Sequence, residues 1–331
     1  TAYANLQLLS NPLKIKLANN INNNVSIQFK VSVWVGDEQE YLSSENVTVN
    51  VKNSMLLYGV KTDTLVLSSD KEYLVSDNLA LTSSAYYTIE PGTTLKISDG
   101  KKISIRDNAK FIAVGNKDSI INFIPENIYW TGISISSVNK VLLDFVNISD
   151  VVSSNMSQDL FEITRDADLA KNILFKNLII QNLAVRSLGR YMNIEKSNII
   201  NGKFLYRDGN FTSKYKWNNI VRNSDAINYP YSGQYFTGPS QVTNQGYYQN
   251  IFNNQTNFSA GTNLTIPLDS IYLGSSKELI IRKSIQDVLN NSTTPGLFIF
   301  NRIQTKPFEE AHGIVWKVLV NGKDAQDEYD S

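Results

Sequence analysis

Residues Thr93 to Ile124 read TTLKISDGKKISIRDNAKFIAVGNKDSIINFI, and this stretch decides the fold class. Apolar and polar residues largely alternate along it, with the period of two that is typical of strands. The pairs Asp-Gly, Asp-Asn and Gly-Asn interrupt the alternation at short intervals, as turns do. The stretch therefore predicts short strands that are separated by tight turns.

A second pattern, an asparagine followed by an apolar residue, recurs along the rest of the chain. Successive asparagines lie 30, 21, 21 and 31 residues apart. A period of this size with short apolar runs is typical of a solenoid in which every turn is one repeat. The pattern occurs in FVNIS, FKNLI, KSNII, WNNIV and YQNIF, at Asn147, Asn177, Asn198, Asn219 and Asn250.

Parallel stacking of such coils places equivalent residues above one another. We therefore expect the five asparagines to form a ladder at a corner, because each side-chain amide carries both donors and an acceptor. The alternative is a chance match in a chain rich in asparagine, against which the two equal intervals argue. The residues expected to stack inside as an apolar column are Ile148, Leu178, Ile199, Ile220 and Ile251. The aromatic residues expected to share another column, two positions before the asparagines, are Phe145, Phe175, Trp217 and Tyr248.

Three phrases carry a resemblance to a known family. They are YTIEPGTTLKI from Tyr87, YWTGISI from Tyr129 and IYLGSSKELIIRKSIQDVLNNS from Ile271. The chain resembles the right-handed parallel β-helix proteins of the pectate-lyase-like group, and within it large secreted proteins of gut bacteria, over roughly Ser54 to Asn301. The resemblance implies that the first phrase begins a series of coils, the second marks a turn and the third closes the solenoid. It also implies a location outside the cell or on the outer surface of a bacterium.

The regions outside the repeat have their own patterns. Before residue 54, LKIKLANN, VSIQFKVSVWV and NVTVNVKN alternate like antiparallel strands and resemble the last strands of an immunoglobulin-like domain. From Ser275, a capping box to Glu278 precedes apolar residues at roughly helical spacing, which predicts a short amphipathic helix. The apolar residues of that helix are Leu279, Ile280, Ile285, Val288 and Leu289.

These patterns predict an all-β chain: a right-handed parallel β-helix with partial β-sandwich strands at the N-terminus and a short C-terminal capping helix. The expected divisions are a partial immunoglobulin-like sandwich over 1–53, the solenoid over 54–274, a capping helix and strap over 275–310, and over 311–331 the first strand of a following domain. The last strand is predicted from Ile314 to Val320. The chain has no initiating methionine or signal sequence, so we expect it to be part of a longer protein.

Composition excludes several classes of function. The 31 basic and 31 acidic residues cancel, so no net charge attracts nucleic acid. Cysteine is absent, which excludes disulfides and thiolate chemistry. No apolar run reaches the roughly 18 residues that a transmembrane helix needs. The only histidine, His312, has no G-x-S-x-G motif to accompany it, so a serine triad is not predicted.

Carboxylates are the remaining candidates for chemistry. Polysaccharide-cleaving β-helices use paired carboxylates, or an acidic calcium cluster with a basic residue. The hydrolases among them typically show NTD, a double aspartate, GHG and RIK, none of which occurs here. Asp166 and Asp168, beside Arg165, are the most clustered acids and form either solvated loop charges or a calcium site. The acids considered are Asp144, Asp150, Asp166, Asp168, Asp208 and Asp225. We therefore predict no catalytic residue and no cofactor, with calcium as the open alternative.

Aromatic residues are the candidates for binding. The segment from Ser224 to Gly246 holds the extra residues of one long interval, and its rings have no obvious place in the core. Flat rings suit sugar-binding surfaces and protein interfaces, although a loop folded over its own rings explains them too. The candidate binding residues are Tyr229, Tyr231, Tyr235 and Phe236.

Two functions of different classes follow. The first is a non-catalytic spacer or binding module of a large exported bacterial protein, with a polysaccharide or a host or surface protein as partner. In the resembling proteins such segments can follow a catalytic domain, including subtilisin-like proteases. The second is a carbohydrate-active β-helix, a lyase or hydrolase of acidic polysaccharide, which the fold alone supports.

Overall fold

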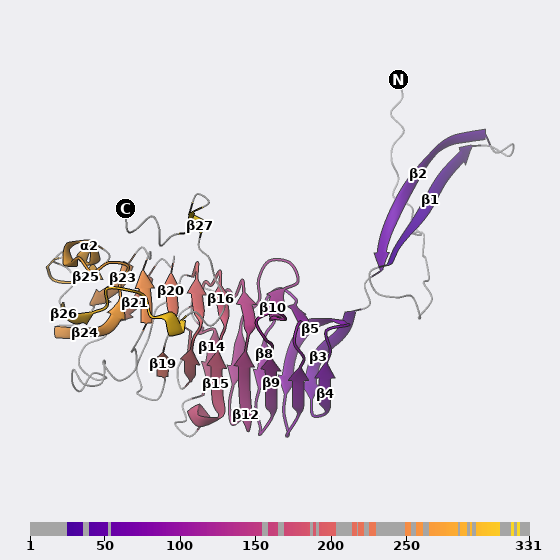
Figure 1. Ribbon diagram of the computed structural model, residues 1–331. Coiled ribbons are helices and arrows are strands. Elements are labelled where there is room, and N and C mark those ends of the chain that lie inside the picture. The colour runs from indigo at the N-terminus through magenta and orange to yellow at the C-terminus, as the bar shows by residue number, and fades with distance from the viewer. Residues whose placement is uncertain are drawn as a thin grey trace. The chain divides into compact units, whose positions relative to one another are not determined.

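The structure is a computed structural model of the chain, and its contacts divide the chain into two units, Thr1–Ser54 and Met55–Ser331 (Figure 1). The finer borders predicted at residues 275 and 311 stay predictions. The structure describes residues 25–35, 40–51, 54–153, 158–164, 169–185, 188–189, 192–202, 214–216, 218–221, 225–229, 249–252, 256–260, 265–283, 285–289, 292, 296–311, 319–320 and 323–324.

The first unit contains one antiparallel hairpin. Strand β1 (Val25–Val35) pairs with β2 (Glu40–Val51), starting from Val25 opposite Val51. Both strands alternate apolar and polar residues, as the sequence predicts. Val31 and Val47 nevertheless remain 47% and 44% exposed. The predicted strand LKIKLANN lies outside the described residues.

The second unit is built from stacked coils whose strands form two large parallel sheets. The short sheet consists, in order, of β4 (Thr64–Leu67), β6 (Tyr86–Ile89), β9 (Lys110–Val114), β12 (Lys140–Asp144), β15 (Ile173–Lys176), β17 (Asn193–Glu195) and β19 (Lys214–Lys216). The long sheet consists of β3 (Ser54–Lys61), β5 (Glu72–Leu81), β7 (Thr94–Ile97), β8 (Ile103–Ile105), β10 (Ile121–Pro125), β11 (Ile133–Ile135), β13 (Val146–Ser149), β14 (Phe161–Ile163), β16 (Ile179–Gln181), β18 (Asn198–Ile200), β20 (Asn219–Val221), β22 (Gln249–Phe252), β24 (Thr265–Tyr272) and β26 (Leu297–Ile303).

Each coil adds one strand to the short sheet and then one or two strands to the long sheet. Strands β6, β7 and β8 form one coil, and β9, β10 and β11 form the next (Figure 1). Each strand pairs in parallel with its counterpart one coil away, for example β6 with β9 and β7 with β10. A third sheet, β21 (Asp225–Tyr229), β23 (Thr256–Ala260) and β25 (Ile285–Gln286), continues this stacking. The predicted all-β parallel β-helix is therefore confirmed.

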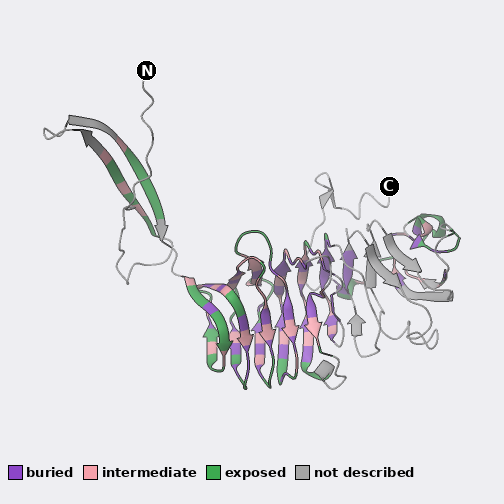
Figure 2. Ribbon diagram, turned by 180° about the vertical axis from the view of Figure 1, so that it is seen from behind, coloured by how far each residue is buried: buried purple, intermediate pink, exposed green. Residues whose placement is uncertain are grey.

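The core lies between the two large sheets. Residues along each strand alternate between the interior and the outer face, which Figure 2 shows as alternating colours. On the long sheet Leu95, Phe123 and Ile148 lie in register and are buried. Phe175 of the short sheet stacks on Phe161 of the long sheet, with 4.3 Å between the ring centroids. Each buried apolar side chain of this size contributes about 1.5–3 kcal/mol.

Sharp corners join the strands, and unusual backbone conformations form them. The strand registers place Phe145, Asn177 and Lys196 at one corner, with φ of 53°, 51° and 52°. Another corner needs glycine itself: Gly132 has φ of +99°, and a Cβ there would lie 2.5 Å from the carbonyl oxygen of Leu160. The W-x-G-I phrase therefore marks a turn where only glycine lets successive coils approach this closely.

The expected ladder of five asparagines needs correction. Asn198, Asn219 and Asn250 lie in register. In the preceding coil, however, the residue opposite Asn198 is Ile179 and not Asn177. Asn177 lies two residues earlier because the left-handed corner falls there. Asn147 pairs with Ile179, so it stands in the same column but is separated from Asn198 by that isoleucine.

The expected inner columns change for the same reason. Ile180, not Leu178, aligns with Ile148 and Ile199. Phe145 is a corner residue, whereas Phe175 lies within β15 opposite Leu143. Those two aromatic residues therefore do not share a column. Trp217 and Tyr248 lie outside the described residues.

The predicted C-terminal helix is shorter than expected. Helix α2 (Glu278–Arg282) begins after Lys277, which makes no side-chain capping bond, so the predicted capping box is wrong. Ile285 belongs to β25, opposite Phe258, because the chain returns to the coil geometry after little more than one helical turn. Leu279, Ile280, Val288 and Leu289 are consequently exposed, while Ile281 and Ile285 are buried.

Short elements complete the described chain. A 3-10 helix, η2 (Leu169–Asn172), precedes β15, and η3 (Glu309–Ala311) follows β26. Ala311 is fully buried, and its carbonyl accepts a hydrogen bond from the Asn219 side chain at 3.0 Å. The segment after β26 therefore lies against the outer face of the long sheet at β20. Strand β27 (Leu319–Val320) pairs antiparallel with β28 (Lys323–Asp324), and most of the strand predicted from Ile314 lies outside the described residues.

Candidate functional site

The structure describes only part of the residues that the sequence singles out. The backbone of Tyr229 belongs to β21, opposite Ala260, so this residue is part of a strand and not of the inserted loop. The same strand begins at Asp225. Outside the described residues lie Asp166, Asp168, Asp208, Tyr231, Tyr235, Phe236 and His312.

Asp144 is the most buried of the predicted acids that the structure describes, with 8% of its surface exposed. It lies at the end of β12, and each of its oxygens contacts a side chain of the next coil, one through a hydrogen bond and one through an ion pair. Asn177 Nδ2 donates to Oδ1 at 2.7 Å, and Lys176 Nζ lies 3.2 Å from Oδ2. The carboxylate thus joins two coils at the corner where Asn177 has its left-handed conformation.

Asp150 has a similar environment at the other end of β13. Asp150 itself has a positive φ, of 57°, and its Oδ1 accepts a hydrogen bond from Asn182 Nδ2 at 3.0 Å. A whole strand, Val146–Ser149, which spans about 10 Å from its first to its last residue, separates it from Asp144. Each carboxylate therefore binds an amide of the next coil, and the two lie at opposite ends of one strand.

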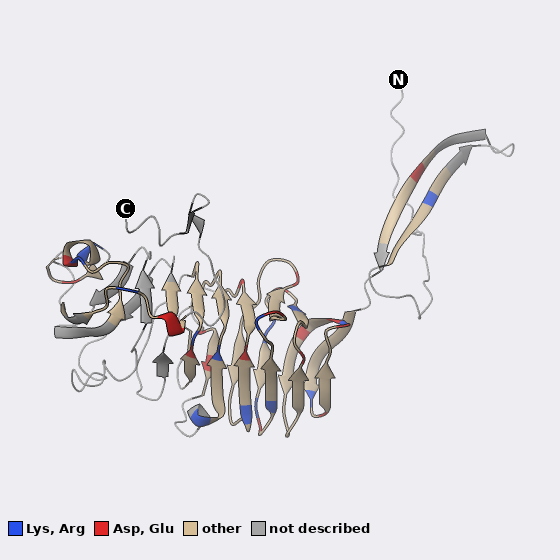
Figure 3. Ribbon diagram, in the orientation of Figure 1, with Lys and Arg blue, Asp and Glu red and all other residues tan. Residues whose placement is uncertain are grey.

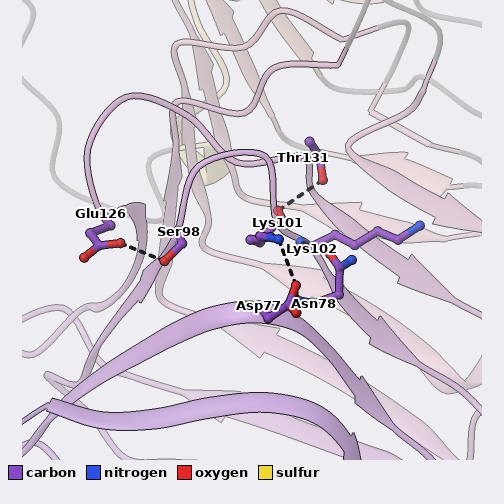
Figure 4. Close-up of polar contacts among 7 residues, drawn as sticks. All are labelled: Asp77, Asn78, Ser98, Lys101, Lys102, Glu126 and Thr131. Atoms are coloured by element: carbon purple, nitrogen blue, oxygen red, sulfur yellow. Dashed lines mark hydrogen bonds and ion pairs between the residues drawn. The ribbon is translucent and has the colours of Figure 1, made fainter.

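A third polar group gathers at an exposed corner of the first coils (Figure 4). Lys101 Nζ donates to Asp77 Oδ1 at 2.8 Å, and the neighbouring Lys102 N–H donates to Asn78 Oδ1 at 3.1 Å. Ser98, in the same coil as Lys101, donates from its Oγ to Glu126 Oε2 of the next coil at 2.7 Å. The carbonyl of Lys101 also accepts a hydrogen bond from the Thr131 hydroxyl at 3.1 Å. These contacts connect three successive coils.

Hydrogen bonding changes the acidity of groups in these coils. The bond from Lys101 holds the pKa of Asp77 below its ordinary value, with help from the Asn78 backbone. The Ser68 hydroxyl lowers the pKa of Asp70 in the same way. Burial raises the pKa of the Tyr87 phenol, and nearby Asp63 adds to the effect. Both aspartates are thus charged at neutral pH, whereas the tyrosine is neutral.

The outer face of the short sheet has a different character. Its central column contains Val66, Thr88, Ile112, Leu142 and Leu174 in consecutive register, and we call this column the aliphatic stripe. Val66 is 52% exposed and the other four are half-buried. The stripe thus places aliphatic side chains on a sheet face that is open to solvent.

Charged residues border the aliphatic stripe on both sides. At the starts of the strands Tyr86, Lys110 and Lys140 lie in register, and we call this column the lysine border (Figure 3). Lys110 Nζ lies 5.5 Å from the centroid of the Tyr86 ring. At the other ends of the strands Asp144 lies opposite Lys176, with which it forms an ion pair.

Sequence reasoning missed two features that the register reveals. The buried polar corner lies one residue before the asparagine column: Ser197 N–H donates to Asn218 Oδ1 at 3.0 Å, and the Leu178 N–H donates to Ser197 Oγ at 3.0 Å. The doubled asparagine in WNNIV was the available signal. The sequence also contained a signal for the lysine border, because Lys110 and Lys140 each begin a strand of alternating pattern.

Metal and membrane features are absent from the part of the chain that the structure describes. No group of three His, Asp or Glu side chains there could hold a metal ion. Within the same ranges, no helix is long and apolar enough to cross a membrane. Because Asp166 and Asp168 lie outside these ranges, the calcium alternative stays a prediction.

Comparison with protein-family models, with curated proteins and with solved structures finds no match to this chain.

Proposed function

We propose that this chain is a non-catalytic spacer or binding module of a large exported bacterial protein, located outside the cell or on its surface. The parallel β-helix supports the likeness to pectate-lyase-like secreted proteins that the three phrases suggest. The antiparallel N-terminal strands are compatible with a neighbouring immunoglobulin-like domain, and a polysaccharide or a surface protein remains the proposed partner.

The observation that carries the proposal is the use of polar side chains between coils. Asp77 binds Lys101, Asp144 binds Lys176 and Asn177, and each contact joins one coil to the next. A lysine whose ammonium donates to a carboxylate is charged, so it does not serve as a base that removes a proton. These residues therefore hold neighbouring coils together, which suits a rigid spacer.

A carbohydrate-active enzyme is the second candidate, and one observation favours it. Acidic residues lie beside lysines at two places, the Asp77–Lys101 pair and the Asp144–Lys176 pair. Such a combination is what a polysaccharide lyase requires, provided that the lysine is free to accept a proton.

An assay of turnover separates the two candidates. The purified chain is incubated with polygalacturonate and with other acidic polysaccharides, with and without added calcium, and new chain ends are measured. We expect no turnover above the buffer control. Turnover that disappears in Lys101→Met, in Lys176→Met or in the double variant Asp166→Asn with Asp168→Asn would establish the enzyme instead.

A further inference from the structure

The aliphatic stripe is unusual for a solvent-facing sheet. Val66 begins it, Thr88 follows, and Ile112, Leu142 and Leu174 continue it in direct register with one residue from each coil. Neighbouring members stand about 4.8 Å apart, the spacing between strands, so Ile112, Leu142 and Leu174 form a continuous aliphatic row, which Thr88 separates from Val66. Contiguous exposed apolar surface of this kind marks an interaction site.

The lysine border is positive and, among the described residues, carries no compensating carboxylate. Within the described residues, neither Lys110 nor Lys140 has a carboxylate within ion-pair distance; Lys110 contacts the Tyr86 ring instead. On the opposite border Lys176 pairs with Asp144 at 3.2 Å and lies in register with Glu195, so that border carries no excess of positive charge. Two like charges stacked one coil apart repel each other, and a partner with carboxylates at that border would relieve the repulsion.

We propose that the outer face of the short sheet binds an acidic polypeptide segment, whose aliphatic side chains lie on the stripe and whose carboxylates pair with Lys110 and Lys140. This inference rests on the proposed function as a binding module and names the partner's chemistry. The apolar contact would exclude water, and the charge pairing would fix the position of the segment along the solenoid.

The composition of the face favours a polypeptide over other polyanions. The stripe consists of branched aliphatic side chains, with one exposed ring, Tyr86, at its border, whereas sugar-binding surfaces use flat aromatic rings. Anionic membranes recruit clusters of about 4–8 basic residues, and nucleic acids require still longer basic tracks. Two lysines beside an apolar row fit a side-chain pattern of alternating acidic and aliphatic residues instead.

Binding of synthetic peptides to the full chain tests the inference. The probe is a short fluorescent peptide in which leucine and glutamate alternate; the comparison peptides alternate leucine with lysine and serine with glutamate. We expect the leucine–glutamate peptide to bind at least about tenfold more tightly than either comparison peptide, measured by fluorescence anisotropy. Its affinity should fall with added salt, because part of the attraction is between charges.

Matched variants locate the site. The double variant Lys110→Glu with Lys140→Glu and the single variant Leu142→Ser should each weaken binding by about tenfold or more. The control is Lys71→Glu with Lys117→Glu, which makes the same change in net charge at two exposed turn lysines and should leave binding unchanged. Circular dichroism and a urea midpoint show whether each variant is folded.

Several results would overturn the inference. Absence of peptide binding to the folded wild-type chain would do so, as would equal weakening in the Lys71/Lys117 control. If polygalacturonate or vesicles of phosphatidylcholine and phosphatidylglycerol bind more tightly with the same dependence on Lys110 and Lys140, the occupant is a glycan or a membrane. Self-association that Leu142→Ser abolishes would identify a second copy. None of these results bears on turnover, so the proposed non-catalytic role is tested separately.

Discussion

The side-chain amide of Asn219 donates to Oδ1 of Asn198, one coil away, at 2.6 Å, and both residues are almost fully buried. Asn219 Nδ2 also donates to the carbonyl of Ala311, which brings the C-terminal segment against the same face. The Nδ2 group of Asn198 is buried without a hydrogen-bond acceptor, because the residue opposite it in the preceding coil is Ile179. Ile179 therefore separates the Asn198–Asn219 amide pair from the earlier pair in which Asn147 Nδ2 donates to Asn122 Oδ1 at 3.1 Å, and Asn219 makes more bonds than Asn198.

This asymmetry predicts different costs for two similar substitutions. Asn219→Ala removes two buried hydrogen bonds and should lower the free energy of unfolding by about 1–3 kcal/mol. Asn198→Ala removes one bond together with an unsatisfied donor, so its cost should be smaller. Urea denaturation of both variants measures the difference. An equal or larger loss for Asn198→Ala would contradict the described bonding.

Asp144→Ala should also destabilise the fold, because it leaves Asn177 and Lys176 without their acceptor. For a buried carboxylate that accepts two side-chain donors, the expected loss is about 1–3 kcal/mol. Asp118→Ala is the matched control, since Asp118 lies in an exposed turn of the preceding coil. A comparable loss in the control would show that the position of Asp144 between coils does not matter.

Gly132→Ala should be severely destabilising, since its added Cβ would meet the Leu160 carbonyl at 2.5 Å in a positive-φ corner. Gly59→Ala provides the control, because Gly59 also has a positive φ, of +68°, but open space around the added atom. The backbone penalty alone is about 1 kcal/mol, and we expect Gly132→Ala to exceed the Gly59→Ala cost clearly. Thermal denaturation of the two variants compares them, and similar melting temperatures would argue against close packing at Gly132.

The pair Asp77–Lys101 predicts a pH dependence. The hydrogen bond from Lys101 lowers the folded-state pKa of Asp77 below its ordinary value of 3.8. The stabilisation is therefore present above pH 3.8 and is lost as the pH falls through the lower folded-state pKa. An NMR titration of the Asp77 carboxyl should give a midpoint below 3.8, and Lys101→Met should move that midpoint upward. A midpoint that the variant does not change would exclude the bond as the cause.

Much of the architecture could be predicted from the sequence. The prevailing alternation in Thr93–Ile124 identified strands and turns, because side chains of a strand point alternately to opposite faces. The repeated asparagine pattern identified stacked coils, because identical positions recur wherever each coil repeats the same path. These signals are local, so they can be seen without knowing which coil lies beside which.

The register of the coils was decided only by the tertiary structure. Asn177 and Asn198 are separated by the same 21 residues as Asn198 and Asn219, yet only the second pair lies in register. Asn219 and Asn250 lie in register although 31 residues separate them. Residues inserted between strands change the length of a coil without changing its register, so intervals along the chain do not determine alignment.

The candidate binding face depended on that register in the same way. Ile112, Leu142 and Leu174 are unremarkable in the sequence, where each lies among other apolar residues of its strand. They become one outward-facing row only because in-register parallel pairing brings the outward-facing position of each strand next to that of its neighbour. The sequence by itself determined which residues alternate; the tertiary structure decided which of the outward residues stand together, since that choice belongs to contacts between coils and not to any single strand.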